Sequence, residues 1–335
     1  MKTSTVAALP PRVRSLAASI ALGALSAAGS GAPSAQEWKP DKPIELVATN
    51  APGGGSDRIL RLMVKILGSY VPVPANVVNK PGGGSAISYN YVNQFPGDGH
   101  RLVLGSRSLL TNNIAGPGPS YTTLTPVVQV FSEYISVNVK PVSPIRSGRD
   151  LVDYVKRDPT AVTFGIATSV GGPNHQGAAA PLKAAGIDIR KMKNVIFPSG
   201  GAASTAMLGG HVDVVPLSVA FGAQLLRNKQ ARMLAVTSPA RLPGELADVP
   251  TWTELGYEVD VAQWRAFIGP RGMTPAQIAY WESLIQRVSQ AEEWKKELAE
   301  NFWQPRIMGH AELLQFLARD NQDAKAFLTE LGLAK

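Results

Sequence analysis

The 335-residue chain contains no cysteine, which excludes disulfide bonds, thiol catalysis, cysteine-based zinc sites and a lipid anchor on an amino-terminal cysteine. Histidine is scarce as well: the four histidines are widely separated, and none has a second histidine at the i+4 spacing of a helical metal site. The sequence has no Gly-x-Ser-x-Gly nucleophile elbow, no dinucleotide-binding glycine pattern between a strand and a helix, and no phosphate loop ending in Gly-Lys-Ser or Gly-Lys-Thr. We therefore expect a protein that is not an enzyme and needs no metal or cofactor.

Long hydrophobic runs are also missing. The apolar stretch at residues 16–25 is shorter than the roughly 20 residues of a membrane-spanning helix, and no later run approaches that length. Basic residues precede this stretch and small residues follow it, which is typical of a secretory signal peptide at residues 1–35. Ser26-Ala27-Ala28 fits a small-x-small cleavage site, whereas Pro33-Ser34-Ala35 has a proline at its outer position, so we expect cleavage between residues 28 and 36. The mature protein is then expected to be exported, without a transmembrane segment.

Charge of neither sign is concentrated in the sequence. The chain has 33 basic and 25 acidic residues, and removal of residues 1–35, which include three basic and no acidic residues, lowers the formal net charge from +8 to +5. Runs of Lys or Arg interleaved with aromatic residues are absent, so we expect no nucleic-acid partner. With 44% hydrophobic and 17% charged residues, the composition is that of a globular protein long enough for two domains.

Short β-branched runs alternate with helix-like stretches along the chain. Residues 57–70 carry apolar side chains at helical spacing behind Ser56, a candidate N-cap. The alternation predicts an α/β protein with mostly parallel sheets. The predicted strands cover residues 44–49, 101–106, 127–131, 134–139, 162–167, 195–198, 212–217 and 233–237.

The last third of the sequence is predominantly helical. Thr274-Pro275-Ala276-Gln277 combines a Thr cap, a proline in the first turn and a Gln three residues after the cap, which together predict the start of a helix. Helical spacing continues from residue 292 to residue 333, interrupted only by Pro305 and Gly309. We expect these helices to cover a sheet formed by earlier parts of the chain.

Two glycine-rich loops each separate a strand-like run from a helix-like run. Because glycine lacks a Cβ, such loops can aim successive backbone N–H groups at one point, and the following helix adds its positive end. We therefore expect one acidic small molecule to be held by backbone amides. Asp57 is expected to stabilise the first turn of its helix, because a bare carboxylate would repel the anion. The loops are Ala51-Pro52-Gly53-Gly54-Gly55-Ser56-Asp57 and Asn79-Lys80-Pro81-Gly82-Gly83-Gly84-Ser85.

A series of short motifs is spread from about residue 38 to the C-terminus. Besides the two glycine-rich loops, they are Lys42-Pro43-Ile44, Val77-Val78, Pro96-Gly97-Asp98-Gly99, Pro198-Ser199-Gly200-Gly201, Leu208-Gly209-Gly210-His211-Val212-Asp213, Leu234-Ala235-Val236-Thr237-Ser238 and Asp248-Val249-Pro250-Thr251. Together they resemble the periplasmic solute receptors of tripartite tricarboxylate transporters, also called the Bug family. The phrase Gln263-Trp264-Arg265 ahead of Phe267-Ile268-Gly269-Pro270 is similar to the branch around the tricarboxylate receptors themselves. The number, order and spacing of the motifs make the resemblance specific.

The resemblance implies an α/β fold like that of the type II periplasmic binding proteins, with two α/β domains around a hinged ligand cleft. Residues 38–140 plus 264–335 would form domain one, and residues 141–263 would form domain two. It implies a monomeric solute-binding receptor that captures a small organic acid, such as a di- or tricarboxylate, and delivers it to a tripartite tricarboxylate-type membrane permease. An exported ligand sensor without a transport role is an alternative, and an enzyme handling phosphate or carboxylate groups is a less favoured one. The identity of the acid stays open.

The family's first-domain binding loops map onto the two glycine-rich loops, where backbone amides and bridging water grip one carboxylate of the ligand. Departing from the common family pattern, this chain has Gly83 for alanine and Ser85 for the last glycine. The Ser85 hydroxyl either contacts the ligand or caps its helix, and we favour the cap. The residues expected to contact the ligand here are Ala51, Gly54, Gly55, Ser56, Gly83, Gly84 and Ser85.

Domain two would supply specificity. The family has small hydroxyl residues and a histidine near Thr168, Ser169 and His175, although this loop can also simply cap the following helix without touching a ligand. Ser199 and Gly200 follow the next predicted strand, where open α/β sheets present their ligand crevice. Arg265 is the charged candidate, because a guanidinium can bind a carboxylate bidentately, and a salt bridge within the protein is its alternative role.

Overall fold

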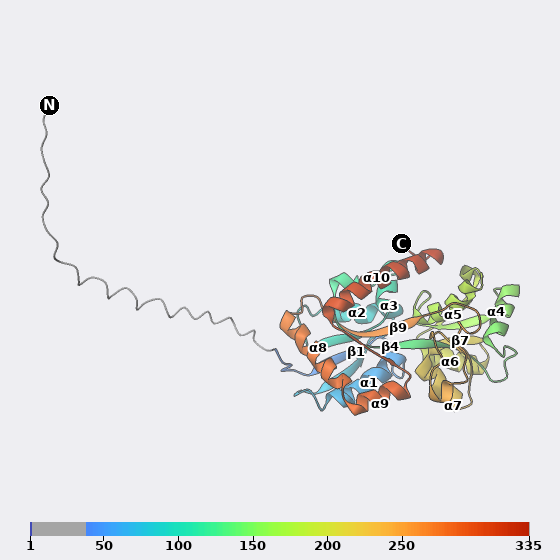
Figure 1. Cartoon of the computed structure of the whole chain (residues 1–335), viewed down its shortest axis with the longest axis horizontal. Helices are drawn as coiled ribbons and strands as arrows, with labels where there is room; N and C mark the ends of the chain where they lie inside the picture. Colours follow the sequence, from blue (N-terminus) through green and yellow to red (C-terminus); the bar gives the residue numbers. More distant parts are fainter. Residues whose placement is uncertain (2–37, 335) are drawn as a thin grey trace. The chain divides into compact units, whose positions relative to one another are not determined.

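A ten-stranded sheet runs through the part of the chain that our computed structural model describes, Met1 and residues 38–334 (Figure 1). The predicted signal peptide and its cleavage sites lie outside the described residues, apart from Met1. The strands are β1 (Ile44–Ala48), β2 (Ala75–Asn79), β3 (Arg101–Gly105), β4 (Thr125–Val139), β5 (Thr163–Ala167), β6 (Lys193–Phe197), β7 (Val214–Ser218), β8 (Arg232–Val236), β9 (Ala262–Gly269) and β10 (Gln304–Met308).

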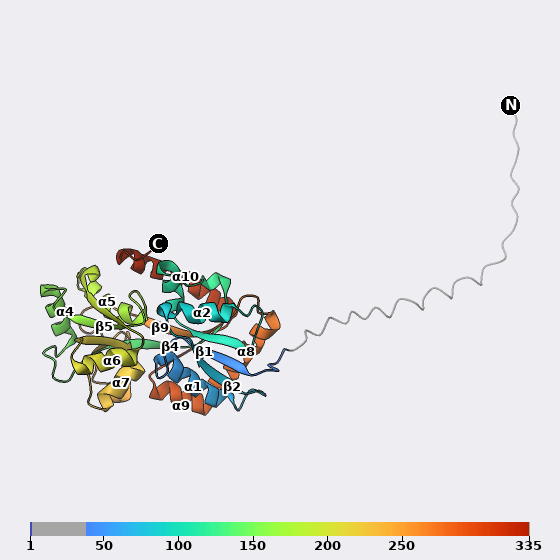
Figure 2. The ribbon, with the colours of Figure 1, turned by 180° about the vertical axis from the view of Figure 1, so that it is seen from behind.

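Helices cover both faces of this sheet, as Figures 1 and 2 show from opposite sides. No described helix is both long and apolar enough to cross a membrane. The helices are α1 (Gly55–Leu67), α2 (Ala86–Asn93), α3 (Ser108–Ala115), α4 (Gly148–Arg157), α5 (Pro173–Ala184), α6 (Gly200–Gly209), α7 (Val219–Arg227), α8 (Pro275–Ser289), α9 (Glu292–Glu300) and α10 (His310–Glu330), and a short 3-10 turn, η1 (Gly83–Ser85), precedes α2.

The long strand β4 belongs to two parts of the sheet, because it changes partners between Tyr134 and Ile135. Up to Tyr134 it pairs with β9, and from Ile135 onward it pairs with β7 and β8. We call β2, β1, β3, β9, β10 and the start of β4 the first half-sheet. The second half-sheet comprises the end of β4 with β7, β8, β5 and β6.

The sheet is mixed, so the prediction of mostly parallel strands is only partly correct. Each half-sheet has a parallel core, β2-β1-β3 in the first and β7-β5-β6 in the second. The strands β4, β9 and β10 add antiparallel pairs. The βαβ alternation predicts the parallel cores, whereas the strands that join the halves come from distant parts of the chain and leave no such pattern.

Apolar side chains that alternate along the strands fill a core on each face of the first half-sheet. Ile44 and Leu46 point to the face covered by α1, α8 and α9, whereas Val47 points to the face covered by α2, α3 and α10. In the second half-sheet, α4 and α5 cover one face, and α6 and α7 pack on the rest. The predicted role of the C-terminal helices as a cover for an earlier sheet is therefore confirmed.

Some local predictions need correction. The two strands predicted at residues 127–131 and 134–139 are one strand, because the intervening Ser132 and Glu133 pair with Trp264 and Gln263 of β9. Strands β2 and β9 were not among the predicted strands. Residues 304–308 form β10 instead of helix, and Pro305, which cannot donate to a ladder, is tolerated because this short strand pairs only with β4.

Helix starts show why capping is predictable in some places and not in others. Thr274 forms the predicted capping box with Gln277. Ser56, in contrast, is not an N-cap: helix α1 begins at Gly55, and its N-cap residue is Gly54. Ser56 lies inside the first turn, and its hydroxyl bonds the preceding loop instead.

Candidate functional site

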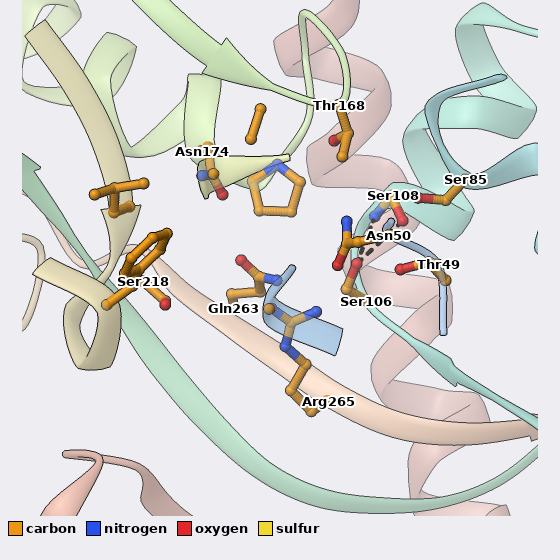
Figure 3. A pocket seen from close by; sticks show the side chains of 16 residues that line it. Thr49, Asn50, Ser85, Ser106, Ser108, Thr168, Asn174, Ser218, Gln263 and Arg265 are labelled. Atoms are coloured by element: carbon orange, nitrogen blue, oxygen red, sulfur yellow. Dashed lines mark hydrogen bonds between the residues drawn. The ribbon is translucent and has the colours of Figure 1, made fainter. Parts of the chain in front are cut away.

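A cavity of about 60 Å³ lies where the C-terminal ends of strands from both half-sheets meet (Figure 3). Since one water molecule needs about 10–15 Å³ by this measure, the cavity has room for a small polar molecule. Figure 3 shows Asn174 and Ser218 on one side, Ser85, Ser106 and Ser108 on the other, and Gln263 and Arg265 between them. We call it the binding cavity; it is lined by Thr49, Asn50, Gly55, Ser85, Ser106, Ser108, Ala167, Thr168, Pro173, Asn174, Gly200, Leu217, Ser218, Phe221, Gln263 and Arg265.

Six helices begin at the wall of the binding cavity. Gly55, Ser108, Pro173 and Gly200 are the first residues of α1, α3, α5 and α6, and Ser85 and Ser218 are the N-caps of α2 and α7. The first N–H groups of a helix have no partner within the helix, and the helix dipole makes this end positive. The cavity wall is therefore electropositive and rich in backbone donors.

The loop after β1 is held in shape by its own side chains. The Ser56 hydroxyl accepts from the amides of Thr49 at 2.9 Å and Asn50 at 3.2 Å, and donates to Asn50 Oδ1 at 2.7 Å. The Ser56 amide also donates to Asn50 Oδ1, at 2.9 Å. This network fixes the loop and leaves the Gly55 backbone at the cavity.

Asp57, which was predicted to stabilise the first turn of α1, lies in that turn and also holds the preceding loop. Its carboxylate accepts from the Gly53 amide at 2.9 Å, from Asn79 Nδ2 at 3.0 Å and from Arg61 Nε at 3.0 Å. Burial alone raises the pKa of Asp57, but these hydrogen bonds outweigh burial and hold the pKa below its ordinary value. Asp57 therefore stays ionised and faces its own helix.

The second glycine-rich loop places Ser85 differently from our prediction. Ser85 is the N-cap residue of α2, with a φ of +89°, but its side chain makes no capping hydrogen bond. The hydroxyl lines the binding cavity instead, so the expectation that it caps the helix is wrong. A left-handed conformation directs the side chain away from the helix start and is costly for a residue with a Cβ, which is a reason to suspect a functional role.

Two further serines on the first half-sheet form a hydroxyl cluster below Ser85. Ser106 Oγ and Ser108 Oγ are 3.0 Å apart, and the buried Tyr89 hydroxyl lies 3.2 Å from Ser108 Oγ. Ser106 follows β3, and Ser108 begins α3. Both serines line the cavity, and neither was among the predicted site residues.

The second half-sheet contributes strand ends and helix starts. Thr168 directly follows β5 and adopts a φ of +69°, while its amide donates to the Phe197 carbonyl at 2.8 Å. Asn174, in the first turn of α5, is oriented by a hydrogen bond of 2.9 Å from its Nδ2 to the Pro216 carbonyl. Thr168 is the second non-glycine lining residue in the left-handed region, after Ser85.

Arg265 forms the salt bridge that was its alternative role, and its contact with a ligand stays a prediction. Its Nε donates to Glu133 Oε1 at 2.7 Å and its Nη2 lies 2.5 Å from the same oxygen, so it forms a buried salt bridge, and it also lines the binding cavity. The Gln263 amide, oriented with its oxygen toward the guanidinium, accepts from Nη1 at 3.0 Å and Nη2 at 2.6 Å. The guanidinium is thus held rigidly at the cavity floor.

Five predicted site residues line the binding cavity and eight do not. Those in the lining are Gly55, Ser85, Thr168, Gly200 and Arg265. The other predicted residues form the supporting layer behind it: Ala51 accepts from the Gly54 amide, Ser56 bonds Asn50, Ser199 caps α6 through the Ala202 amide, and Gly83 belongs to η1. Gly84 and Ser169 face each other, since a Cβ added to Gly84 would lie 3.3 Å from Ser169 Cβ.

His175 is buried behind the cavity wall. Its Nδ1 accepts from the Gly171 amide at 3.1 Å, and Asn194 Nδ2 lies 3.3 Å from its Nε2. Burial lowers the pKa of His175 from 6.5 to about 4, so the imidazole is neutral at neutral pH. In this position it stabilises the turn that leads into α5.

Sequence reasoning missed lining residues that carry a recognisable signal. Thr49, Ser106 and Ser218 are polar residues at the ends of strands that the sequence predicts, where an α/β sheet presents its crevice. Asn50 directly precedes the first glycine-rich loop and Asn174 lies between Ser169 and His175, but the sequence predicts ligand contacts only at their neighbours. Gln263 lies on β9, a strand that the sequence does not predict, so no predicted strand end marks this residue as a candidate.

Comparisons with known proteins identify the family and the fold of this chain. The family model described as "Tripartite tricarboxylate transporter family receptor" matches residues 59–333. The protein BugT of Bordetella pertussis is 26% identical over 317 residues, which cover 92% of this chain and 95% of that protein. The structure of Rpa4515 of R. palustris with adipate has a TM-score of 0.81 and 21% identity, covering 88% of this chain and 99% of that chain.

A second solved structure, MatC (Rpa3494) from Rhodopseudomonas palustris with bound malate, has a TM-score of 0.78 and 19% identity and covers 86% of this chain and 99% of that chain. These likenesses confirm the predicted α/β fold of the periplasmic binding proteins. With the family model spanning most of the sequence, the chain belongs to the receptor family of the tripartite tricarboxylate transporters.

Proposed function

We propose that this protein is a periplasmic receptor that captures a small organic acid, a di- or tricarboxylate or another carboxylate, and delivers it to a tripartite tricarboxylate-type membrane permease. The observation that carries the proposal is the convergence of six helix N-termini on the binding cavity. Each N-terminus presents the equivalent of about half a positive charge. Because Glu133 already neutralises Arg265, these backbone charges provide most of the attraction for an anion.

The first half-sheet supplies the grip on one carboxylate in this proposal. The Gly55 backbone at the start of α1, together with the Ser85, Ser106 and Ser108 hydroxyls, surrounds the carboxylate, and Arg265 lies at the cavity floor. Gly54, Ser56, Gly83 and Gly84 act from behind, because they set the path of the two loops. Hydrogen bonds from oriented donors to a carboxylate are shorter and stronger than bonds between neutral groups.

The choice of ligand class follows from the family and from the cavity together. Rpa4515 was solved with adipate and MatC with malate, and both compounds are dicarboxylates. The cavity offers donors from both half-sheets, so a compact acid with a second polar group satisfies both sides. Dicarboxylates are therefore the first compounds to test.

The two half-sheets correspond, we propose, to the two predicted domains. The crossovers then lie at residues 134–135 and 261–262, slightly before the predicted boundaries near 140 and 263. A ligand that touches both domains favours the closed arrangement, because only its contacts with the second domain distinguish closed from open. Thr168, Asn174, Gly200 and Ser218 are the groups that sense closure in this scheme.

Delivery to a permease and the absence of catalysis complete the proposal. Family membership supports both, and the predicted signal peptide supports a periplasmic location. An exported sensor uses the same binding site, so only the membrane partner distinguishes sensing from transport. Co-purification from membranes that contain the tripartite permease provides that distinction.

A thermal-shift screen of carboxylic acids on the purified exported protein tests the binding function. A ligand at one hundred times its dissociation constant stabilises the folded state by about 2.7 kcal/mol, which raises the melting temperature clearly. Isothermal titration calorimetry on the best compounds then gives affinity and stoichiometry. If no organic acid stabilises the protein, or if a bound acid is turned over and this turnover depends on one polar side chain, the receptor proposal is wrong.

A further inference from the structure

A buried polar cluster lies behind the wall of the binding cavity, where the start of α3, strand β9 and the C-terminal helix α10 meet. Its centre is Asp320 of α10, whose side chain is only 11% exposed. Asp320 Oδ2 accepts from Trp264 Nε1 at 2.7 Å, and Asp320 Oδ1 lies 3.3 Å from Arg107 Nη2. Arg107 Nη1 in turn donates to Gln176 Oε1 of α5 at 2.7 Å. We call these four residues the Asp320 cluster, and none of the four lines the binding cavity.

Both direct partners of Asp320 are flanked by residues that do line the cavity. Arg107 lies between two lining serines, and Trp264 lies between the lining residues Gln263 and Arg265. Because successive side chains of a strand point to opposite faces, β9 directs Gln263 and Arg265 to the cavity and Trp264 to the core under α10. Anchoring Arg107 and Trp264 from behind therefore fixes the backbone that carries these lining side chains.

Gln176 extends the cluster to the second half-sheet. It lies in the first turn of α5, two residues after Asn174 of the cavity lining. A second pair that joins the half-sheets, Lys183 and Glu330, is partly exposed to solvent. The Arg107 side chain is only 10% exposed, so its bond to Gln176 is less screened than that surface pair. The Asp320 cluster thus ties α5 to the first half-sheet.

Helix α10 contacts both half-sheets, and Asp320 lies between the two contacts. Leu313 and Leu317 belong to the core of the first half-sheet, whereas Phe327 packs on the core of the second. Figure 1 shows α10 running from above α2 and α3 toward α5. A helix that is packed at both ends is a firm base, so a side chain in its middle can hold other segments in place.

Burial makes the Asp320 carboxylate and the Arg107 guanidinium depend on each other. Removal from water raises the pKa of Asp320, and the Arg107 charge and the Trp264 hydrogen bond offset part of that effect. Arg107 has one further acceptor among the described side chains, which is Gln176. A guanidinium held at two points in a buried setting keeps one conformation, which fixes the spacing between α3, α5 and α10.

We propose that Asp320 and Arg107 are positioning residues of the receptor, which hold the lining segments of α3, β9 and α5 at the spacing that the ligand requires. The inference rests on the proposed carboxylate-binding function, because this spacing acts on the affinity for the acid. Oriented donors bind a carboxylate well only in the correct geometry, and a site whose supporting residues are loosened loses affinity. Neither residue touches the ligand, since both lie behind the cavity wall.

Calorimetric titration of the purified exported protein with succinate, malate and adipate tests the inference. Asp320→Asn keeps an oxygen that can accept from Trp264 and removes the charge that holds Arg107. We expect the dissociation constants of the acids that bind to rise about tenfold, because a bond to a charged group is lost. Gln176→Ala should raise them about fivefold, the effect of one net hydrogen bond. Asp323→Asn makes the same change at an exposed position of α10 and should keep them within about twofold.

The double variant of Asp320→Asn and Gln176→Ala separates positioning from simple support of the fold. Because both changes act through Arg107, the combined loss should stay at about tenfold and not reach the about fiftyfold of two independent changes. Arg107→Lys keeps the positive charge but loses the planar fork that serves two acceptors. It should weaken binding as Gln176→Ala does, and it replaces Asp320→Asn in the test if that variant does not fold.

Melting temperatures of the ligand-free variants are measured in parallel. A lower melting temperature with unchanged affinity would show that Asp320 and Arg107 only support the fold. Additive losses in the double variant, or an equal loss in Asp323→Asn, would show that Arg107 does not connect the segments. Each of these results overturns the inference, while binding by the unaltered protein still supports the receptor. If none of the three acids binds the unaltered protein, the proposed function fails for dicarboxylates, and the inference fails with it.

Discussion

The two half-sheets build their shares of the binding cavity in different ways. On the first half-sheet, the lining side chains bond one another: Ser56 links Thr49 to Asn50, and Ser106 contacts Ser108. On the second, lining groups such as Gly200 and Ser218 are simply the starts of helices, and Thr168 is held through its backbone. The first half-sheet is therefore a preorganised cradle for the ligand. The second half-sheet presents hydrogen-bond donors that can bind the ligand only when the two half-sheets approach each other.

The contacts between the half-sheets differ on the two sides of the cavity. Near α10, Arg107 Nη1 donates to Gln176 Oε1 at 2.7 Å, and Lys183 Nζ lies 2.5 Å from Glu330 Oε2. On the side of α1 and α7, Arg58 lies over the Phe221 ring at 5.4 Å, which is a weaker contact in an exposed setting. We therefore expect the cleft to open first between α1 and α7, while the contacts near α10 continue to hold the two half-sheets together.

The strongest test of the preorganised cradle is Gly54→Val. A Cβ at Gly54 would lie 2.5 Å from Asn50 Cβ and 2.9 Å from the Ala51 carbonyl oxygen, so the valine must push Asn50 away and break its bonds to Ser56. We expect loss of affinity by at least about a thousandfold, or about 4 kcal/mol, measured by calorimetry on folded protein. Ser85→Ala removes one hydroxyl and keeps the backbone, so its loss should stay below about tenfold.

Equal losses in the two variants would mean that side-chain hydroxyls, and not the loop backbone, hold the ligand. Full binding by a correctly folded Gly54→Val protein would remove the first loop from the site altogether.

The second test concerns the buried His175 and separates stability from binding on the second half-sheet. Because its folded-state pKa of about 4 lies below the ordinary 6.5, the unfolded chain binds the proton first as the pH falls. Stability should be unaffected above about pH 6.5 and should decrease by about 3 kcal/mol by pH 4, as measured by urea unfolding.

In the same titration, His175→Gln should flatten this part of the profile, whereas His211→Gln, at an exposed position, should leave it unchanged. A profile that persists in His175→Gln would show that another group titrates. If His175→Gln instead lowers the affinity at neutral pH without any loss of stability, His175 contacts the ligand.

The predictable part of the fold is the part built from local patterns. Runs of β-branched residues predict β1, β3, β5, β6 and β7, and the glycine-rich loops behind β1 and β2 predict anion-binding turns, because these signals depend only on neighbouring residues. The strands β9 and β10 depend on pairing with β4, more than one hundred residues earlier in the chain. Such pairing has no local signature when the strand is short and carries polar residues.

The same distinction holds for the site. Gly55, Thr168 and Gly200 lie in the lining because strand ends and helix starts are readable from sequence. Within a loop, however, local hydrogen bonds and backbone angles decide which side chain faces the cavity. Asn50 lines the cavity while Ser56 turns inward to bond it. Ser85 lines the cavity because its φ is positive. These outcomes depend on backbone angles that the residue types alone do not determine.

The third test asks whether the second half-sheet acts mainly in closure. Replacing both Thr168 and Asn174 by alanine removes two polar groups of its share of the lining. We expect about tenfold weaker binding, or about 1.4 kcal/mol, and loss of the ligand-induced decrease in radius of gyration measured by small-angle X-ray scattering. Asn228→Ala, at an exposed position at the end of α7, is the control and should retain both.

A wild-type protein whose radius of gyration does not change with ligand would contradict the hinged-receptor mechanism. If the double variant still closes with full affinity, the second half-sheet does not sense the ligand through these side chains.

The smallest expected effect comes from a matched pair of serines at two helix starts of the second half-sheet. Ser199 Oγ accepts from the Ala202 amide at 3.2 Å and does not line the cavity, whereas Ser218 lines the cavity and its side chain does not cap α7. Ser199→Ala should therefore cost about 1 kcal/mol of folding stability and leave affinity within about twofold. Ser218→Ala should do the reverse, with unchanged urea unfolding and a loss of affinity of a few-fold. If Ser199→Ala instead weakens binding at full stability, Ser199 contacts the ligand as its motif predicts, because a hydroxyl that accepts from the Ala202 amide can still donate its own proton to a carboxylate.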